Sequence, residues 1–230
     1  MIELRVLGTR GNIHPTAPRH AKHSGILLGD ELLLDLGERS FLRLHPRWIV
    51  ITHLHSDHAF FVEAPIEEKP RVYAPETHHH CRATILTPGE RLRLGGWRIT
   101  AIPTIHSHRI RSLAYRVDRG GKSLLYTGDL VGIHRKHHRL LGNLDLVITE
   151  GSFVRRGGLV RVSRSGRRFG HAGIPDLIAF FAAFTPRILI VHLGSWFYRN
   201  PRAAHEQVRA LGGMHGVEAA IGWDGMRLRL

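Results

Sequence analysis

Residues 48–58 read Trp-Ile-Val-Ile-Thr-His-Leu-His-Ser-Asp-His, an apolar run that passes directly into a cluster of histidines and an aspartate. The run predicts a buried strand, and α/β folds place their sites in the loops after the carboxyl ends of strands. Because residues i and i+2 of an extended segment face the same side, His53 and His55 can converge on one metal ion. Asp57 and His58 follow as the chain turns and can reach a second ion. These ligand types suit Zn²⁺, with Mn²⁺ or Fe²⁺ as alternatives.

An alternative interpretation of this motif is a histidine-rich surface loop. The chain has another such run in His78, His79 and His80. That triplet falls in a polar stretch with a helical pattern, whereas the motif at 53–58 follows a buried strand. Its position therefore favours a metal site.

Four further residues with the chemistry of a metal site each follow a strand-like run of their own. They are Asp35, His106, Asp129 and His192. Taken alone, either of these histidines is more typical of an ordinary buried side chain. The ordered set is what indicates a common site.

These motifs, in this order, resemble the metallo-β-lactamase superfamily over nearly the whole chain. The resemblance implies a four-layer αββα sandwich with two metal ions about 3.5–4 Å apart that hold a bridging hydroxide. The implied ligands are His53, His55 and His106 for the first ion, Asp57, His58 and His192 for the second, and Asp129 as the bridge between them. Asp57 is also expected to orient the nucleophile, and Asp35 to support the ligands from behind.

The kind of bridging residue separates branches of this superfamily. The β-lactamases place a cysteine on the second metal, but Cys81 matches no such position. The carboxylate of Asp129 is similar to the phosphodiesterase, transfer-RNA 3′-processing, glyoxalase II and lactonase branches. Only 22 residues separate His106 from Asp129. The long arm of bacterial transfer-RNA 3′-processing enzymes does not fit there, which favours a small or less structured phosphodiester.

Two further segments resemble the RNase Z and cyclic-phosphodiesterase branch. The N-terminal residues 7–11 and 20–24 are similar to its first loop, and residues 148–153 and 169–172 are similar to its Glu-Ala-Thr-Phe and His-Ser-Thr signatures. The resemblance implies that Glu150 supports the site and that His171 is a general acid or phosphate ligand. This sequence departs from the pattern at Ser152 and at Ala172-Gly173. The alternative for His171 is a solvated residue at the start of a helix.

The formal net charge is +14, and most of the positive charge comes from arginine. Such a charge favours anionic partners such as phosphate esters or nucleic acid, although generic solubility of a heat-adapted protein explains it equally well. Six arginines precede His171, namely Arg155, Arg156, Arg161, Arg164, Arg167 and Arg168. We expect Arg167 and Arg168 to bind an anionic substrate, with a merely solvated basic loop as the alternative.

Short apolar runs punctuated by glycine and proline predict many strands and few helices. The predicted strands are 2–7, 25–28, 31–36, 48–52, 71–74, 91–94, 97–102, 113–118, 122–127, 144–149, 187–192, 217–221 and 226–230. The predicted helices are 57–63, 75–83, 175–184 and 201–211. This order indicates two sheets with helices outside, an α/β arrangement. No linker divides the chain, so we expect one domain over residues 1–230.

The remaining expectations concern the setting of the protein. The sequence lacks a signal peptide and any apolar stretch near the 20 residues that cross a bilayer, so we expect no membrane association. Together with a single cysteine, this favours a reducing, cytoplasmic location. A homodimer is compatible with the sequence.

Two rival functions stay open beside the phosphodiesterase. One is hydrolysis of a lactone, thioester or β-lactam by the same metal site. The other is a non-catalytic, metal-stabilised protein that binds nucleic acid.

Overall fold

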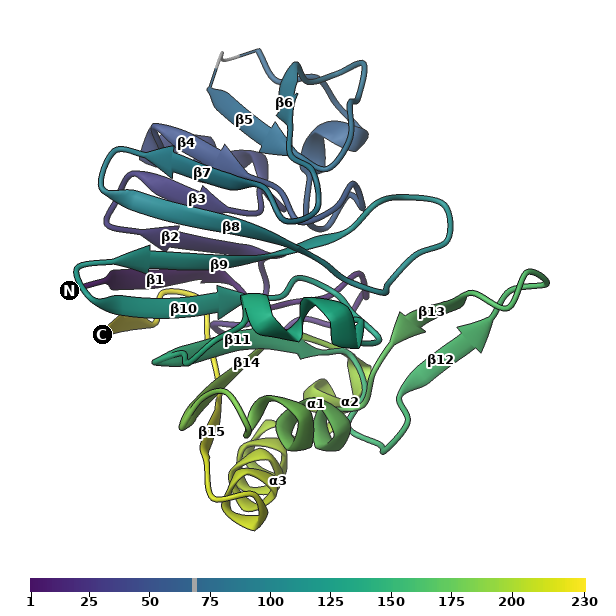
Figure 1. The fold of residues 1–230 in the computed structure, drawn as a ribbon. Helices are drawn as coiled ribbons and strands as arrows, with labels where there is room; N and C mark the ends of the chain where they lie inside the picture. Colours follow the sequence, from purple (N-terminus) through teal and green to yellow (C-terminus); the bar gives the residue numbers. More distant parts are fainter. Residues whose placement is uncertain (68–69) are drawn as a thin grey trace.

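The computed structural model describes residues 1–67 and 70–230, and its framework is two sheets stacked face to face (Figure 1). The first sheet contains β1 (Glu3–Gly8), β2 (Gly25–Leu28), β3 (Leu32–Leu34), β4 (Trp48–Val50), β5 (Arg71–Ala74), β6 (Ala83–Ile85) and β16 (Arg227–Arg229), in the order β16-β1-β2-β3-β4-β5-β6. The second contains β7 (Arg91–Leu94), β8 (Trp97–Pro103), β9 (Leu113–Arg119), β10 (Lys122–Tyr126), β11 (Leu146–Gly151), β14 (Arg187–Leu193) and β15 (Glu218–Ile221), in the order β15-β14-β11-β10-β9-β8-β7.

The main core lies between the two sheets. Along β8, Trp97, Ile99 and Ala101 are each 1% exposed and belong to this core, while Arg98 between them is exposed. This alternation is what a strand with one buried face requires. In β11 both faces are covered, because Ile148 packs between the sheets and Val147 packs against the helices outside.

The outer layers differ in kind. The second sheet is covered by α1 (Ile174–Phe181), α2 (Ser195–Arg199) and α3 (Pro201–Met214). Over the first sheet lie two short 3₁₀ segments, η1 (Arg39–Leu44) and η2 (Phe60–Val62), whose Phe41 and Phe61 fill a separate core. The predicted sandwich of two sheets with flanking helices is confirmed. Among the described residues, no helix is long and apolar enough to cross a membrane.

Several strands run parallel and end at one edge of the sandwich. In the first sheet β3, β4 and β5 are parallel neighbours, and in the second β10, β11 and β14 are. Parallel strands bring their carboxyl ends to the same edge, where α/β folds form sites. The motif at 53–58 follows β4 at this edge.

Two predicted helices are wrong. Residues 57–63 form a tight turn followed by η2. The Leu36 amide donates to the His58 carbonyl and the Phe60 amide donates to the Leu36 carbonyl, so these groups do not make the hydrogen bonds of a helix. Residues 75–83 contain a turn at His78–Cys81 and then β6, which pairs in parallel with β5. In both places tertiary pairing overrides the local helical pattern.

The segment before His171 is not a loop but a two-stranded hairpin. Its strands are β12 (Leu159–Val162) and β13 (Arg168–His171), and the hairpin projects from the body of the molecule (Figure 1). Gly170 permits the close pairing, since its φ is 112° and an added Cβ would lie 2.0 Å from the Leu159 carbonyl oxygen. We call residues 159–171 the basic hairpin.

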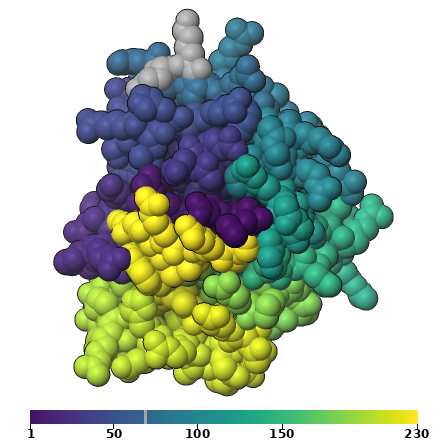
Figure 2. Space-filling view, turned by 90° about the vertical axis from the view of Figure 1, so that its left-hand side faces the viewer, coloured from purple at the N-terminus to yellow at the C-terminus, as the bar shows by residue number. Residues whose placement is uncertain are grey.

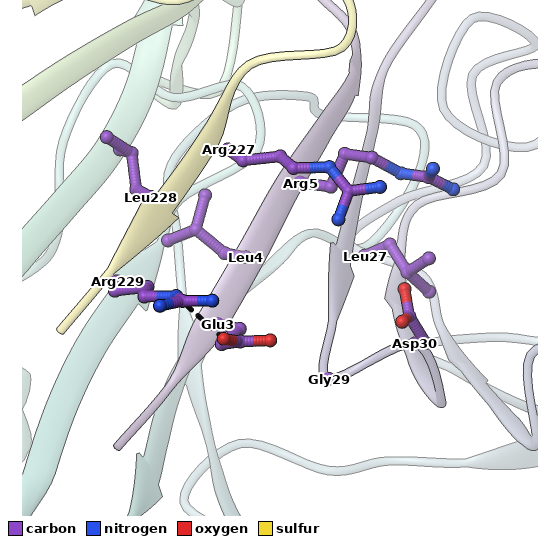
Figure 3. Close-up of a pocket in the computed structure, with 9 residues that line it drawn as sticks. All are labelled: Glu3, Leu4, Arg5, Leu27, Gly29, Asp30, Arg227, Leu228 and Arg229. Carbon is purple, nitrogen blue, oxygen red and sulfur yellow. Dashed lines mark ion pairs between the residues drawn. The ribbon is translucent and has the colours of Figure 1, made fainter.

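The two ends of the described chain lie side by side. Ile2 and Leu230 exchange backbone hydrogen bonds of 3.2 and 2.9 Å, and the first and last segments adjoin on the surface in Figure 2. A pocket of about 320 Å³ beside them is lined by Arg5 and Arg227 among others (Figure 3). There Arg229 pairs with Glu3 at 2.7 Å. Glu3 begins β1, which runs in the same direction as β3 and β4, so this pocket lies at the opposite edge of the sheet from the metal motif.

Candidate metal centre

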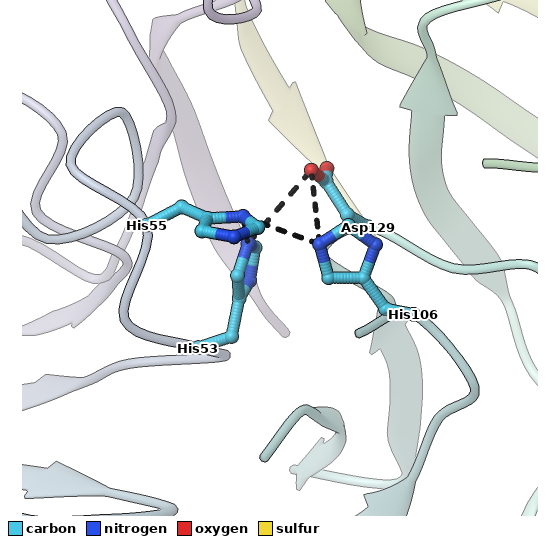
Figure 4. Close-up of side chains that lie close together, drawn as sticks. All are labelled: His53, His55, His106 and Asp129. Atoms are coloured by element: carbon cyan, nitrogen blue, oxygen red, sulfur yellow. Dashed lines mark hydrogen bonds and ion pairs between the residues drawn. The ribbon is translucent and has the colours of Figure 1, made fainter. Parts of the chain in front are cut away.

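The first group of predicted ligands converges at the carboxyl end of β4. His55 Nδ1 lies 3.0 Å from His53 Nε2 and 3.2 Å from His106 Nε2 (Figure 4). Asp129 Oδ2 lies 3.8 Å from His53 Nε2 and 3.9 Å from His106 Nε2. Four donor atoms on separate residues therefore surround one small space.

The second group adjoins the first through Asp129. Asp57 Oδ2 lies 2.8 Å from His192 Nε2 and 3.8 Å from His58 Nε2. The other carboxylate oxygen of Asp129, Oδ1, lies 3.2 Å from His58 Nε2. One oxygen of Asp129 thus faces each group, which is the arrangement of a bridging ligand.

The close approach of Asp129 depends on the residue before it. Gly128 has a φ of 57°, and an added Cβ would lie 2.6 Å from Thr52 Oγ1. A side chain at position 128 would push the Asp129 loop away from β4. Glycine adopts this backbone conformation without steric cost.

Asp35 lies behind the predicted ligands and contacts one of them, His58. Its carboxylate is fully buried and accepts hydrogen bonds from Thr52 N (2.7 Å), Thr52 Oγ1 (2.9 Å) and Tyr126 OH (2.8 Å). It also lies 2.7 Å from His58 Nδ1, which directs the Nε2 lone pair of His58 into the site. Such a partner fixes the tautomer and orientation of a metal-binding histidine.

One supporting residue and one predicted ligand carry backbone strain. Asp35 has a φ of 60° and His192 a φ of 51°, in the left-handed region that side chains rarely adopt. Non-glycine residues in this region cost about 1–3 kcal/mol each and cluster at functional sites. Both strained residues lie at the edge of the sandwich where the predicted ligands converge.

The charges of the site fit cations. Within residues 1–67 and 70–230, every ion-pair partner of Asp57 and Asp129 is a histidine. Although burial raises the pKa of Asp129, the nearby histidines lower it well below its usual range. Burial likewise lowers the pKa of His58, but the surrounding carboxylates hold it well above its usual range. The carboxylates stay charged and require positive charge beside them.

Unpaired atoms point to the same conclusion. His58 Nε2 and Asp129 Oδ1 are buried and have no hydrogen-bond partner in the described part of the chain. A buried polar atom without a partner is costly, so each such atom needs an explanation. Divalent ions held by the two groups would coordinate both atoms. The buried cluster thus matches the binuclear metal site of this fold.

His171 lies beside the metal ligands and is held by Glu150. Its Nδ1 is 2.8 Å from Glu150 Oε2 and 3.8 Å from Asp129 Oδ2. Burial lowers the pKa of His171, but the charge and hydrogen bond of Glu150 outweigh it and raise the pKa to about 9. His171 ends β13, and α1 begins only at Ile174, so the alternative of a solvated helix start does not hold.

A cavity of about 340 Å³ opens over the cluster. It is lined by Gly11, Asn12, Ile13, His55, Asp57, Asp129, Ser152, Phe153, Leu159, His171, His192, Gly194 and Ser195. Arg167 and Arg168, predicted to bind substrate, do not line this cavity. They line a separate groove farther along the basic hairpin. The basic hairpin holds both arginines away from the metal cavity. No pattern in the sequence indicates this hairpin.

Sequence reasoning missed several supporting residues. Ser152 Oγ lies 3.0 Å from His192 Nδ1 and 3.3 Å from His171 Nδ1. The carbonyl of Gly170 lies 3.0 Å from His106 Nδ1, and the Gly170 amide donates to the His106 carbonyl at 2.7 Å. The position of Ser152, two residues after Glu150, was an available signal. The contact of the Gly170 carbonyl with His106 has no such signal in the sequence.

Metal binding should stabilise the protein strongly. A ligand at a thousand times its dissociation constant adds about 4 kcal/mol, which raises Tm by about 10 °C in a domain of this size. Thermal unfolding with Zn²⁺ and after chelation checks this. His79→Ala, in the surface triplet whose ring nitrogens also converge, should keep the shift, and His55→Ala should lose much of it. An equal loss in both variants would mean surface binding.

Comparison with known proteins shows the family and the fold of the chain. Residues 42–192 match the family model described as a β-lactamase superfamily domain. No curated protein matches the chain. Among solved structures, the metallo-β-lactamase fold protein YhfI from Bacillus subtilis is similar at a TM-score of 0.74 and 20% identity, covering 99% of this chain and 98% of its own.

Two further structures show the same fold. A diphosphatase from the PhnP family has a TM-score of 0.71 and 15% identity, over 99% of this chain and 96% of its own. Zn²⁺-bound PqqB from Methylobacterium extorquens has a TM-score of 0.70 and 15% identity, over 99% and 100%. With the family match over residues 42–192 and the buried His/Asp cluster in place, the chain belongs to the metallo-β-lactamase superfamily and is a metal-dependent hydrolase.

Proposed function

We propose that the protein is a phosphodiesterase that uses two divalent metal ions, with Zn²⁺ as the first choice and Mn²⁺ or Fe²⁺ as alternatives. The observation that carries this proposal is the pair of His171 and Glu150 at the wall of the metal cavity. Glu150 occupies Nδ1 of His171, and Nε2 has no hydrogen-bond partner among the described residues. A proton donor beside the metal cluster suits the departure of an alkoxide from phosphorus.

Each part of the site has a role in such a reaction. The implied ligands would hold the two ions, which when bound supply positive charge for phosphoryl oxygens and an activated water. Asp57 keeps its Oδ1 for orienting the attacking water, since only its Oδ2 contacts His192. As the new bond between water oxygen and phosphorus forms, the bond to the leaving oxygen breaks. The Nε2 proton of His171 passes to that oxygen, and Glu150 holds the imidazole in place.

The similar structures give this proposal modest support. One is named as a diphosphatase and another as Zn²⁺-bound. Their identities of 15% show the fold alone, so the substrate class rests on the site. The net charge of +14 also favours an anionic substrate.

A second candidate is hydrolysis of a lactone or thioester. Ile13, Phe153 and Leu159 line the cavity and would suit the apolar part of such a substrate. For a thioester the pair of His171 and Glu150 would have a smaller role, because a thiolate can leave without a proton, whereas the alkoxide released from a lactone would still need one.

The first test is hydrolysis of bis(p-nitrophenyl) phosphate by protein reconstituted with Zn²⁺ or Mn²⁺. We expect turnover that disappears in His55→Ala and persists in His79→Ala. A butyrolactone and an acyl thioester serve as competing substrates. Faster turnover of either one, with no cleavage of the phosphodiester by protein that binds two metals, would overturn the proposal.

A further inference from the structure

A second concavity, larger than the metal cavity, adjoins the basic hairpin. Its volume is about 890 Å³, against about 340 Å³ for the metal cavity. One wall is the loop of residues 103–113 and the other is the turn of the hairpin at 166–168. We call it the arginine groove. Resting on the proposed function, we propose that the arginine groove binds a single strand of nucleic acid whose scissile phosphodiester lies at the metals.

The rim of the groove is cationic. Arg109 and Arg111 stand on one wall and Arg167 and Arg168 on the other, and all four side chains are exposed. Within residues 1–67 and 70–230, none of the four has a carboxylate in ion-pairing distance. The groove contains one carboxylate, Glu76, which accepts a hydrogen bond from the Arg111 backbone amide at 3.2 Å. Four guanidinium groups facing one carboxylate attract a polyanion.

The floor of the groove is apolar. Pro88, Ile105 and Ile110 are among its lining residues. His108 also lines it, and the ring of Phe169 on β13 packs edge-on against His108 at 4.6 Å between centroids. A ligand for this surface needs flat apolar groups as well as repeated negative charges. Unpaired nucleotides have both, because every base offers a π-face and every linkage a phosphate.

Two segments of the chain connect the groove to the metal centre. His106 is a predicted ligand, and its neighbours Ile105 and Ser107 line the groove. On the basic hairpin, Leu159 and His171 line the metal cavity, while Arg167 lines the groove. Three residues separate His171 from Arg167, and the four extended steps between them span about 13 Å. A small cyclic diester cannot span it, whereas an extended strand can.

Other polyanions fit these features less well. Inorganic polyphosphate would use the arginines and leave the apolar floor without a partner. A duplex hides its bases in the stack, so it cannot place them on Ile105 or His108. The combination of rim and floor therefore favours the unpaired strand.

Fluorescence anisotropy tests the proposal directly. The probe is a fluorescein-labelled phosphorothioate oligothymidylate of about twelve nucleotides, bound to the metal-loaded protein over a range of KCl concentrations. Arg109→Ala/Arg167→Ala should weaken binding about tenfold at moderate salt, because the variant removes two exposed cations that would contact phosphates of the strand. The slope of log K against log salt should fall by about 1.4, the value for two phosphate contacts on a single strand.

The matched control is Arg227→Ala/Arg229→Ala in the pocket beside the chain ends (Figure 3). It makes the same change in net charge and should leave affinity within about twofold. Equal losses in both double variants would show a diffuse charge effect and overturn the proposal. Tighter binding of a duplex, or equal binding of polyphosphate, would overturn it as well.

The two proposals fail separately. Hydrolysis of bis(p-nitrophenyl) phosphate by the unsubstituted protein tests the phosphodiesterase and does not require an occupied groove. Oligonucleotide binding tests the groove and requires no cleavage. Hydrolysis without groove-dependent binding would reject the groove alone, and specific binding without hydrolysis would reject the phosphodiesterase.

Discussion

Replacing His171 with alanine should lower kcat by about 10² to 10⁴ for a phosphodiester that releases an alkoxide, such as an RNA dinucleotide. The reason is that Nε2 of His171 supplies the proton which the departing oxygen needs. For bis(p-nitrophenyl) phosphate the loss should be less than about tenfold, because p-nitrophenolate leaves without a proton. Steady-state rates on the two substrates, at equal metal content, measure the difference.

Glu150→Gln is the companion variant. It keeps the size of the side chain but removes the charge that holds His171 by its Nδ1 at 2.8 Å. We expect it to reproduce the same dependence on the leaving group, with a smaller loss. Ser152 then remains as a weaker neighbour of Nδ1 at 3.3 Å. If His171→Ala slows both substrates by the same factor, His171 is not a general acid.

Asp129→Asn should have the largest effect of any single substitution in the site. Its two carboxylate oxygens face the two ligand groups, and the amide lacks the negative charge that these oxygens share. We expect bound metal to fall from two ions to at most one, and hydrolysis to fall by at least about 10³. Elemental analysis of the dialysed protein and turnover of bis(p-nitrophenyl) phosphate measure the two effects.

Asp145→Asn is the control for this substitution. Asp145 pairs with Lys122 at 2.6 Å, just before β11, and has no role in the site. It should keep two metal ions and the full rate. An Asp129→Asn protein that retains two ions and an unchanged rate would show that Asp129 is not the bridge.

Much of the fold was predictable because its signals are local. The strands before Asp129 and His192 are apolar runs that end in a polar residue, and β10 and β14 lie there. The same holds for β4 and the motif at 53–58. When a strand is followed directly by a polar residue in the sequence, the pattern predicts the position of the candidate ligand as well as the strand.

The basic hairpin was not predictable for the opposite reason. Its strands have four residues each, and Gly170 interrupts β13, so neither shows a clear apolar alternation. Their pairing depends on the positive φ of Gly170 and on hydrogen bonds to His106, 64 residues away. The position of Arg167 and Arg168 follows from the hairpin, so it could not be predicted without it.

The helix expected at 75–83 does not form, because strand pairing replaces it. A proline at its start and a polar sequence favour a helix locally. The chain instead turns at His78 and pairs Ala83–Ile85 with β5, where Tyr73 lies opposite Thr84. Edge pairing of a sheet is a long-range contact, which a local pattern does not contain.

The two hydrogen bonds between Gly170 and His106 link events that take place in different parts of the molecule. The Gly170 carbonyl lies at Nδ1 of His106, which leaves Nε2 for the first ion of the proposed site, and the same hairpin carries Arg167 and Arg168 of the groove. If a bound ion raises the affinity of the hairpin for a strand by some factor, a bound strand must raise the affinity for the ion by the same factor. Under metal scarcity, the chains that hold substrate would be the ones that retain their ions.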